Sequence, residues 1–275
     1  MTLSDPVIAF IGGGNMATSL IGGLIDKGFS PAALRASDPL EAGRDRLTRD
    51  FGITTSADND SICAGADVVV LAVKPQVLKG VAQDIAPALA RDTVVVSIAA
   101  GIPVSALESW LGADRAIVRA MPNTPALVHR GASGLFANGN VGSAQRALVE
   151  RLFDAVGIFS WHDNEEDIDA VTALSGSGPA YFFLLMEAME QAGIALGLDP
   201  ASARALTLQT ALGAATMAAS SDVDSAELRR RVTSPGGTTE QAIQTFVAGG
   251  LPELVQDAMA AASRRAAEMA DEFSR

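Results

Sequence analysis

The sequence has few of the residues on which several classes of protein depend. Its one cysteine, Cys63, excludes a disulfide within the chain and suits a reducing cytoplasm. His129 and His162 are the two histidines, so little is left for a zinc site and we expect no metal. Lys and Arg number 20 against 32 Asp and Glu, a formal charge of −12. Such an acidic surface argues against nucleic acid or an anionic membrane as the main partner.

Long hydrophobic runs are missing as well. No stretch of about 18 apolar residues lacks a charge or a break, and the N-terminal residues lack the layout of a signal peptide. We therefore expect a cytoplasmic protein that does not cross a membrane. The 275 residues are 48% hydrophobic and 19% charged, an ordinary globular composition that is sufficient for one large or two smaller domains.

The negative charge is spread unevenly along the chain. Residues 1–164 carry 13 basic and 16 acidic side chains, a net of −3, whereas residues 165–275 carry 7 and 16, a net of −9. The sequence pattern changes at the same place, because apolar runs typical of buried strands precede it and no convincing strand follows. We predict an α/β domain over 1–164 and an all-α domain over 165–275.

The first half alternates between apolar runs and helical patterns, which predicts a mostly parallel sheet with helical crossovers. An amphipathic helix is expected between the last two strands, because one helical face there carries Leu148, Leu152 and Val156. The other expected helices are 15–28, 41–51, 76–89 and 104–111. The expected strands are 7–11, 34–37, 68–73, 94–99, 116–120, 131–138 and 158–161.

The second half contains two helices with few polar residues. Residues 181–197 are apolar almost all round, and residues 201–219 are rich in alanine. A helix that is apolar on every side must be buried in something large. Two such helices within 111 residues favour burial against a partner chain over a monomeric bundle with one central helix.

A glycine-rich turn follows the first expected strand and opens a helix. Gly12, Gly14 and Ala17 match G-x-G-x-x-A, where the first glycine permits the turn and the second lets the backbone approach a pyrophosphate. The helix start at Asn15 and Met16 adds free N–H groups and the positive end of the helix dipole. The turn predicts a dinucleotide-binding, Rossmann-like domain.

Asp38 bears on which dinucleotide binds. It follows Ser37 at the end of the second expected strand, where an acidic side chain usually accepts from the adenosine ribose and repels a 2′-phosphate. Two nearby arginines can offset that repulsion. Asp38 can instead cap the next helix, and one residue can serve both purposes.

Two further turns follow expected strands, at the sheet edge where open α/β sheets bind ligands. In AVKP, residues 72–75, Lys74 can face the cofactor's ribose or phosphate, or be a solvated lysine at a helix start. In MPNTP, residues 121–125, Asn123 or Thr124 can hydrogen-bond a nicotinamide or hold a stiff loop.

A cluster of small polar residues, SPGGTT at 234–239, precedes an expected helix at 240–247. Free amides and hydroxyls at a helix start form a site for a carboxylate. A simple cap needs only one Ser or Thr, so the cluster favours ligand binding. Arg229, Arg230 and Arg231 can keep this region locally positive, or they can form a solvated helix face.

The helical half also lacks the usual proton acceptors. No lysine follows Lys79 and no histidine follows His162, which leaves Tyr181 in this half. A dehydrogenase that deprotonates an alcohol needs a positioned base. A protonated cyclic imine is already electrophilic, and its reduction needs mainly positioning. The lack of lysine and histidine in the helical half therefore favours an imine substrate over a carbonyl substrate.

Taken together, FIGGGNMA, AVKPQ, AMPNTPA, ALSGSGPAY and SPGGTT, in this order and spacing, resemble 1-pyrroline-5-carboxylate reductase over essentially the whole chain. The resemblance implies an N-terminal Rossmann domain and a helical domain that binds substrate and interleaves with its neighbour into a dimer, often assembled further into a decamer. It also implies the last step of L-proline biosynthesis, in the cytoplasm, with NADPH or NADH.

The resemblance also implies roles for individual residues. The imine's carboxylate would meet the Ser234 hydroxyl and the amides of Gly237 and Thr238, and Thr239 would bond the ring nitrogen and guide its proton. Asn59 would lie near the adenosine ribose. The expected cofactor-binding residues are Gly12, Gly14, Asn15, Met16, Ser37, Asp38, Asn59, Ala72, Val73, Lys74, Pro75 and Asn123. The expected substrate-binding residues are Ser234, Gly236, Gly237, Thr238 and the catalytic Thr239.

The chain departs from some family members at Asp38, where they have a small hydroxyl residue that suits a 2′-phosphate. The choice between NADPH and NADH therefore stays open. Two other functions compete with the reductase. A two-domain hydroxyacid dehydrogenase would need a catalytic lysine in the helical half, which has none. A non-enzymatic dinucleotide-binding or scaffold protein would need no reaction at all.

Overall fold

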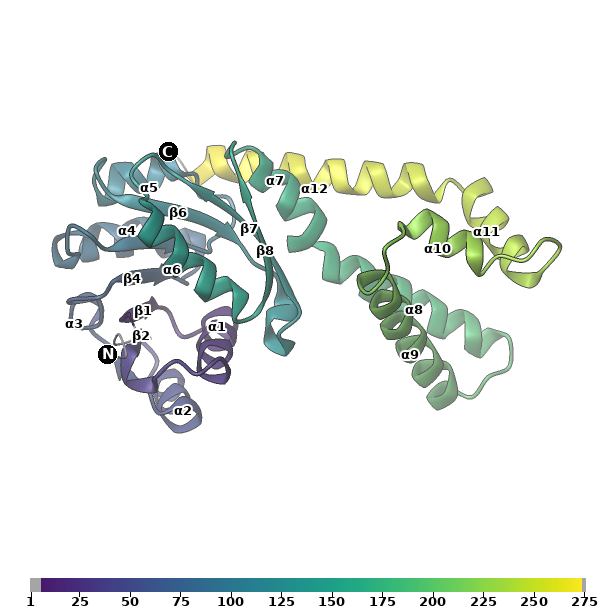
Figure 1. Ribbon diagram of the computed structural model, residues 1–275, viewed down its shortest axis with the longest axis horizontal. Helices are drawn as coiled ribbons and strands as arrows, with labels where there is room; N and C mark the ends of the chain where they lie inside the picture. Colours follow the sequence, from purple (N-terminus) through teal and green to yellow (C-terminus); the bar gives the residue numbers. More distant parts are fainter. Residues whose placement is uncertain (1–5, 274–275) are drawn as a thin grey trace. The chain divides into compact units, whose positions relative to one another are not determined.

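The computed structural model describes residues 6–273 (Figure 1). An eight-stranded sheet has the strand order β3-β2-β1-β4-β5-β6-β7-β8. Its neighbouring strands pair in parallel except for β6 and β7, which are antiparallel, as expected of a mostly parallel sheet. The strands are β1 Ile8–Ile11, β2 Leu34–Ser37, β3 Thr54–Ser56, β4 Val68–Leu71, β5 Val94–Ser97, β6 Ala116–Met121, β7 Gly131–Ala137 and β8 Gly157–His162.

The described chain divides into two compact units. The first unit comprises residues 6–177 and 261–273, and the second comprises residues 178–260. Beyond β8 the described residues form helices and no strand, as predicted. The helices are α1 Asn15–Asp26, α2 Glu41–Phe51, α3 Asn59–Cys63, α4 Pro75–Ile85, α5 Val104–Leu111, α6 Ser143–Asp154, α7 Asp167–Val171, α8 Gly178–Ala195, α9 Pro200–Ala219, α10 Ser225–Arg231, α11 Thr238–Ala248 and α12 Leu251–Phe273.

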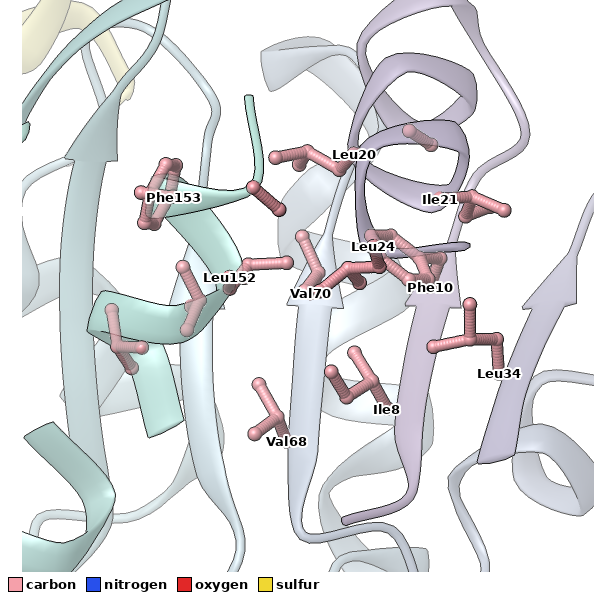
Figure 2. Close-up of a cluster of buried hydrophobic side chains, with 14 of the residues drawn as sticks. Ile8, Phe10, Leu20, Ile21, Leu24, Leu34, Val68, Val70, Leu152 and Phe153 are labelled. Atoms are coloured by element: carbon pink, nitrogen blue, oxygen red, sulfur yellow. The ribbon is translucent and has the colours of Figure 1, made fainter. Parts of the chain in front are cut away.

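The sheet is buried on both faces because successive side chains of a strand point to opposite sides. In β1, Ile8 and Phe10 join one apolar cluster with residues of α1 and α6, whereas Ala9 and Ile11 join another with residues of α4 and α5. Figure 2 shows the first cluster, in which Leu24 of α1 lies over Phe10. Strands covered on both sides explain the apolar runs in the sequence.

Contacts to the sheet decide where the units divide. The guanidinium of Arg119 in β6 is 4% exposed and pairs with Glu165 and Asp169 at 3.1 and 2.9 Å, which binds α7 to the first unit. The end of α12 joins the same unit, where Met269 packs on Gly101. The units therefore differ from the proposed domains 1–164 and 165–275, because these tertiary contacts bring both segments to the sheet.

Several element bounds differ from the sequence-based expectations. The strands at 68–73 and 94–99 end earlier, at Leu71 and Ser97, and the helix at 76–89 is a helix from Pro75 to Ile85 followed by a 3₁₀ turn. Pro87 within that turn cannot continue an α-helix. Strand β3 and helix α3 were not predicted, because they are short and β3 is polar.

The second unit leaves most of its apolar side chains uncovered. Phe182, Phe183 and Leu184 of α8 are 65%, 63% and 67% exposed. The helical run Asp167–Ala195 is long and apolar enough to cross a membrane by length and composition alone, although Glu187 and Glu190 lie within it. This finding qualifies the expectation that no such segment exists.

Candidate functional site

The glycine turn has the geometry that its sequence predicted. Gly12 adopts a φ of +103°, and a Cβ there would lie 2.6 Å from the carbonyl oxygen of Ala72, so only glycine fits. Gly14 instead has open space where a Cβ would project. A bound group can therefore approach the backbone at Gly14.

Helix α1 begins directly after this turn. Gly14 is its N-cap, and the first bond of the helix runs from the Thr18 N–H to the Gly14 carbonyl at 2.9 Å. The amides of Asn15, Met16 and Ala17 precede that bond, so they have no acceptor within the helix. These amides and the space at Gly14 fit a dinucleotide's pyrophosphate.

Asp38 supports the glycine turn from the end of β2. Its Oδ2 accepts from the Gly13 N–H at 3.0 Å, and its Oδ1 accepts from the Leu40 N–H at 2.8 Å. The side chain thus braces the turn and the loop before α2, but it does not cap that helix, whose N-cap is Leu40 with no side-chain hydrogen bond. Contact with a ribose stays a prediction.

The other expected cofactor residues lie near the same strand ends. Ser37 is only 1% exposed, and its carbonyl accepts from the Gly12 N–H at 2.9 Å, so it supports the turn from within. Its hydroxyl is buried without a hydrogen-bond partner among the described residues, and the expected contact with a cofactor stays a prediction. Ala72 and Val73 adjoin Gly12, Lys74 is exposed, and Pro75 and Asn59 begin α4 and α3.

Asn123 has the structural role that the sequence left open. Its Nδ2 donates to the Ser175 carbonyl at 3.0 Å, and its Oδ1 accepts from the Ala132 N–H at 2.9 Å. The residue is 7% exposed. It therefore joins the MPNTP turn to β7 and to the π-helical segment Thr172–Gly176.

The SPGGTT turn, in the second unit, is braced by its own groups. Gly236 has a φ of +72° and donates its N–H to Glu240 Oε2 at 2.7 Å, while the Gly237 N–H donates to the Ser234 carbonyl at 3.0 Å. The glycine amides are thus engaged within the turn, and the expected contact of Gly237 with the substrate stays a prediction. The amides of Thr238, Thr239 and Glu240 begin α11 and remain outside the helix ladder.

The neighbouring arginines lie on an exposed helix face, and two of the three are paired with a carboxylate. Arg230 and Arg231 pair with Glu227 at 2.6 and 2.8 Å, and these hydrogen bonds lower the pKa of that carboxyl. Arg229 lines an apolar groove of about 400 Å³ between α9 and α10, together with Met217. Amides and hydroxyls are therefore the groups that this turn offers to an anion.

Two residues that matter here escaped the sequence-based reasoning. Arg46 contacts the glycine turn from α2, and no local motif marks a contact across 33 positions. Glu240 was detectable, because a Glu at the third position of a helix often accepts from an amide before the helix. Residues 6–273 contain no group of three His, Cys, Asp or Glu side chains suited to a metal.

Comparison with known proteins agrees with both halves of the site. The protein-family model "NADP oxidoreductase coenzyme F420-dependent" matches residues 7–101, and the family model "Pyrroline-5-carboxylate reductase dimerisation" matches residues 165–269. A pyrroline-5-carboxylate reductase of Pseudomonas aeruginosa is 58% identical over 271 residues, which cover 98% of this chain and 99% of the relative. The chain belongs to the pyrroline-5-carboxylate reductase family.

Solved structures of pyrroline-5-carboxylate reductases agree with this membership. The Coxiella burnetii protein has a TM-score of 0.92 and 45% identity, covering 96% of this chain and 98% of its own. The Plasmodium falciparum protein, solved with NADP bound, has a TM-score of 0.86 and 29% identity, covering 98% and 99%. The expected Rossmann-like fold and helical dimerisation region are thereby confirmed.

Proposed function

We propose that this chain reduces 1-pyrroline-5-carboxylate to L-proline with NADPH or NADH, the last step of proline biosynthesis. The observation that carries the proposal is the SPGGTT turn. Its hydroxyls and the first amides of α11 suit a carboxylate, in a chain that also has a pyrophosphate-binding turn. Because the chain belongs to the reductase family, we assign the carboxylate-binding turn to the imine and the glycine turn to the cofactor of the same reaction.

Thr239 and its neighbours hold the imine in this proposal. The Ser234 hydroxyl and the Thr238 amide bind the carboxylate, and Thr239 Oγ1 accepts from the protonated ring nitrogen. Fixing both ends of a small ring leaves one orientation for attack at the imine carbon. When bound, the reduced nicotinamide supplies the hydride. The C=N bond becomes a single bond, and the nitrogen retains its proton.

The acidic side chain at the end of β2 bears on the cofactor. In dinucleotide-binding folds this position faces the adenosine ribose, and a carboxylate there disfavours a 2′-phosphate. We therefore expect NADH to be accepted at least as well as NADPH. The remaining expected contacts, from Asn59, Ala72, Val73, Lys74 and Asn123, belong to the same proposal.

The proposal includes a dimer in the cytoplasm, with assembly to a decamer as a further step. Support comes from the dimerisation model over residues 165–269, which includes the exposed apolar residues of α8. A second copy covers them in the way that a membrane otherwise would. We propose no nucleic acid or membrane partner.

Steady-state kinetics test the proposal directly. The purified protein should oxidise NADH or NADPH only when the imine is present, and proline should accumulate in equal amount. Asp38→Ser, measured beside the parent, should weaken the binding of NADH, because Gly13 loses its acceptor, and should weaken that of NADPH less, because the 2′-phosphate is no longer repelled. Cofactor binding without turnover of the imine would favour a binding or scaffold protein, and oxidation of a hydroxyacid would favour the dehydrogenase.

A further inference from the structure

The two peptide groups on either side of Gly13 are held by opposite charges. The Gly13 N–H donates to Asp38 Oδ2 at 3.0 Å, and the Gly13 carbonyl accepts from Arg46 Nη2 at 2.9 Å. Asp38 directly follows the neighbouring strand β2, whereas Arg46 comes from the middle of α2. The turn is thus fixed by side chains from two other elements.

Arg46 also controls the next residue of the turn. Its Nη2 lies 3.3 Å from Thr18 Oγ1, and this hydroxyl donates to the Gly14 carbonyl at 3.0 Å. The carbonyl and N–H of one trans peptide point in opposite directions. Holding the Gly13 and Gly14 carbonyls therefore turns the N–H groups of Gly14 and Asn15 away from Arg46.

Geometry leaves those N–H groups available to an anion. The space beside Gly14 is open, while a Cβ on Gly13 would lie 2.8 Å from Asp38 Oδ2 and 2.9 Å from Leu47. The turn therefore has one packed side and one free side.

The charge of Arg46 adds to this arrangement. Its Nε is buried without a hydrogen-bond partner, and among residues 6–273 it forms no ion pair with a carboxylate. A partly buried, uncompensated guanidinium favours an anion close by, in the same sense as the helix N-terminus.

We propose that Arg46 is a positioning residue for the cofactor's pyrophosphate, acting from behind the glycine turn through the Gly13 carbonyl and Thr18. The inference rests on the proposed function. It concerns the affinity for any ligand with this pyrophosphate, rather than the reduction of the imine.

Binding of ADP-ribose tests the inference, because this ligand has the pyrophosphate and no nicotinamide. By calorimetry, Arg46→Met should bind ADP-ribose about ten- to hundred-fold more weakly than the parent, as expected for a lost charged hydrogen bond. Arg46→Lys should recover part of the loss, because it restores the charge without the guanidinium's geometry. Arg49→Met is the matched control, since Arg49 lies on the same helix and pairs only with Asp50 among the described contacts.

Kinetics and salt separate positioning from general damage. Arg46→Met should raise the KM for the cofactor, leave the KM for the imine near the parent's, and flatten the salt dependence of ADP-ribose binding. If this variant does not fold, Thr18→Val and Arg46→Lys supply the same comparison. Unchanged ADP-ribose affinity in a folded variant overturns the role of Arg46. A parent that binds none of ADP-ribose, NADH and NADPH overturns the proposed function itself.

Discussion

The two units of the chain use their apolar residues in opposite ways. In the first unit, two clusters bury both faces of the sheet, and Phe10, Leu24 and Phe153 have no exposed surface. In the second unit, Phe182 and Leu184 are mostly exposed, and Ala203 is a rare buried apolar residue. An apolar sequence thus shows that burial is needed, and the tertiary structure shows whether the same chain supplies it.

The largest effect is expected from a cavity in the core of the first unit. Phe153→Ala removes a fully buried ring of α6, which should lower the free energy of unfolding by about 3–5 kcal/mol. Urea denaturation at two protein concentrations measures it, and the loss should be the same at both. A loss that depended on concentration would mean that the first unit also needs a partner.

The exposed face of α8 gives the second prediction. Phe182→Ser would change little on a true surface, but against a second copy it should weaken self-association by about 2–4 kcal/mol, roughly 30- to 1000-fold in Kd. Sedimentation equilibrium measures the Kd. Glu190→Gln, on the same helix, is the control, and equal Kd values for both variants would contradict burial of this face.

A smaller effect is expected at the turn of the second unit. Thr239→Ala should lower kcat/KM for the imine by about 1–3 kcal/mol of transition-state stabilisation, the range of a hydrogen bond to a charged group. Thr245 lies on the same helix and donates to the Gln241 carbonyl, so Thr245→Ala is the control. A normal rate in Thr239→Ala would remove this hydroxyl from the mechanism.

The smallest effect is expected at Cys63, the one thiol of the chain, whose reactivity reports on burial in the first unit. Burial, with Asp60 and Asp58 as lesser causes, raises its pKa to about 12. At about pH 8 a thiol reagent should react far more slowly with the folded protein than in urea, because little thiolate forms. Dilution below the dimer Kd should leave the slow reaction of Cys63 unchanged, because the first unit buries this thiol without a partner. A faster reaction on dilution would contradict the view that only the second unit needs a partner to cover its apolar residues.

The same thiol fixes the sign of a pH effect. In the unfolded chain it ionises near its ordinary value of 9.0, whereas in the folded chain it keeps its proton to about pH 12. The unfolded state therefore binds fewer protons in that interval, and the free energy of unfolding should fall as the pH rises through it.

Most of the sheet could be predicted because its strands are apolar runs with few competing interpretations. Strand β3 and helix α3 could not, since Thr54–Ser56 carries no apolar pattern and is held by pairing with β2 and by side-chain hydrogen bonds to α2 and α3. The positive φ of Gly12 was predictable from a local motif. The burial of Ser37 was not, because it depends on the elements packed around β2.

The candidate site shows the same division. Sequence order and residue chemistry identified both turns, since hydroxyls and glycines before a helix act locally. Which amides remain free depends on side chains that fold back, as Glu240 does to Gly236, or arrive from elsewhere, as Arg46 does to Gly13. The Glu240 bond is local and follows from the residue's position in the helix, whereas the Arg46 bond depends on distance in space and leaves no fixed spacing in the sequence.

By itself the sequence determined the alternation of strands and helices, the glycine turn, the SPGGTT turn and the acidic helical half, because each depends on neighbouring residues or on composition. Only the tertiary structure decided that Asp38 braces Gly13, that Asn123 holds a loop, and that α7 and the end of α12 join the sheet. Those outcomes depend on contacts between residues far apart in the chain, and such contacts exist only once the core has packed.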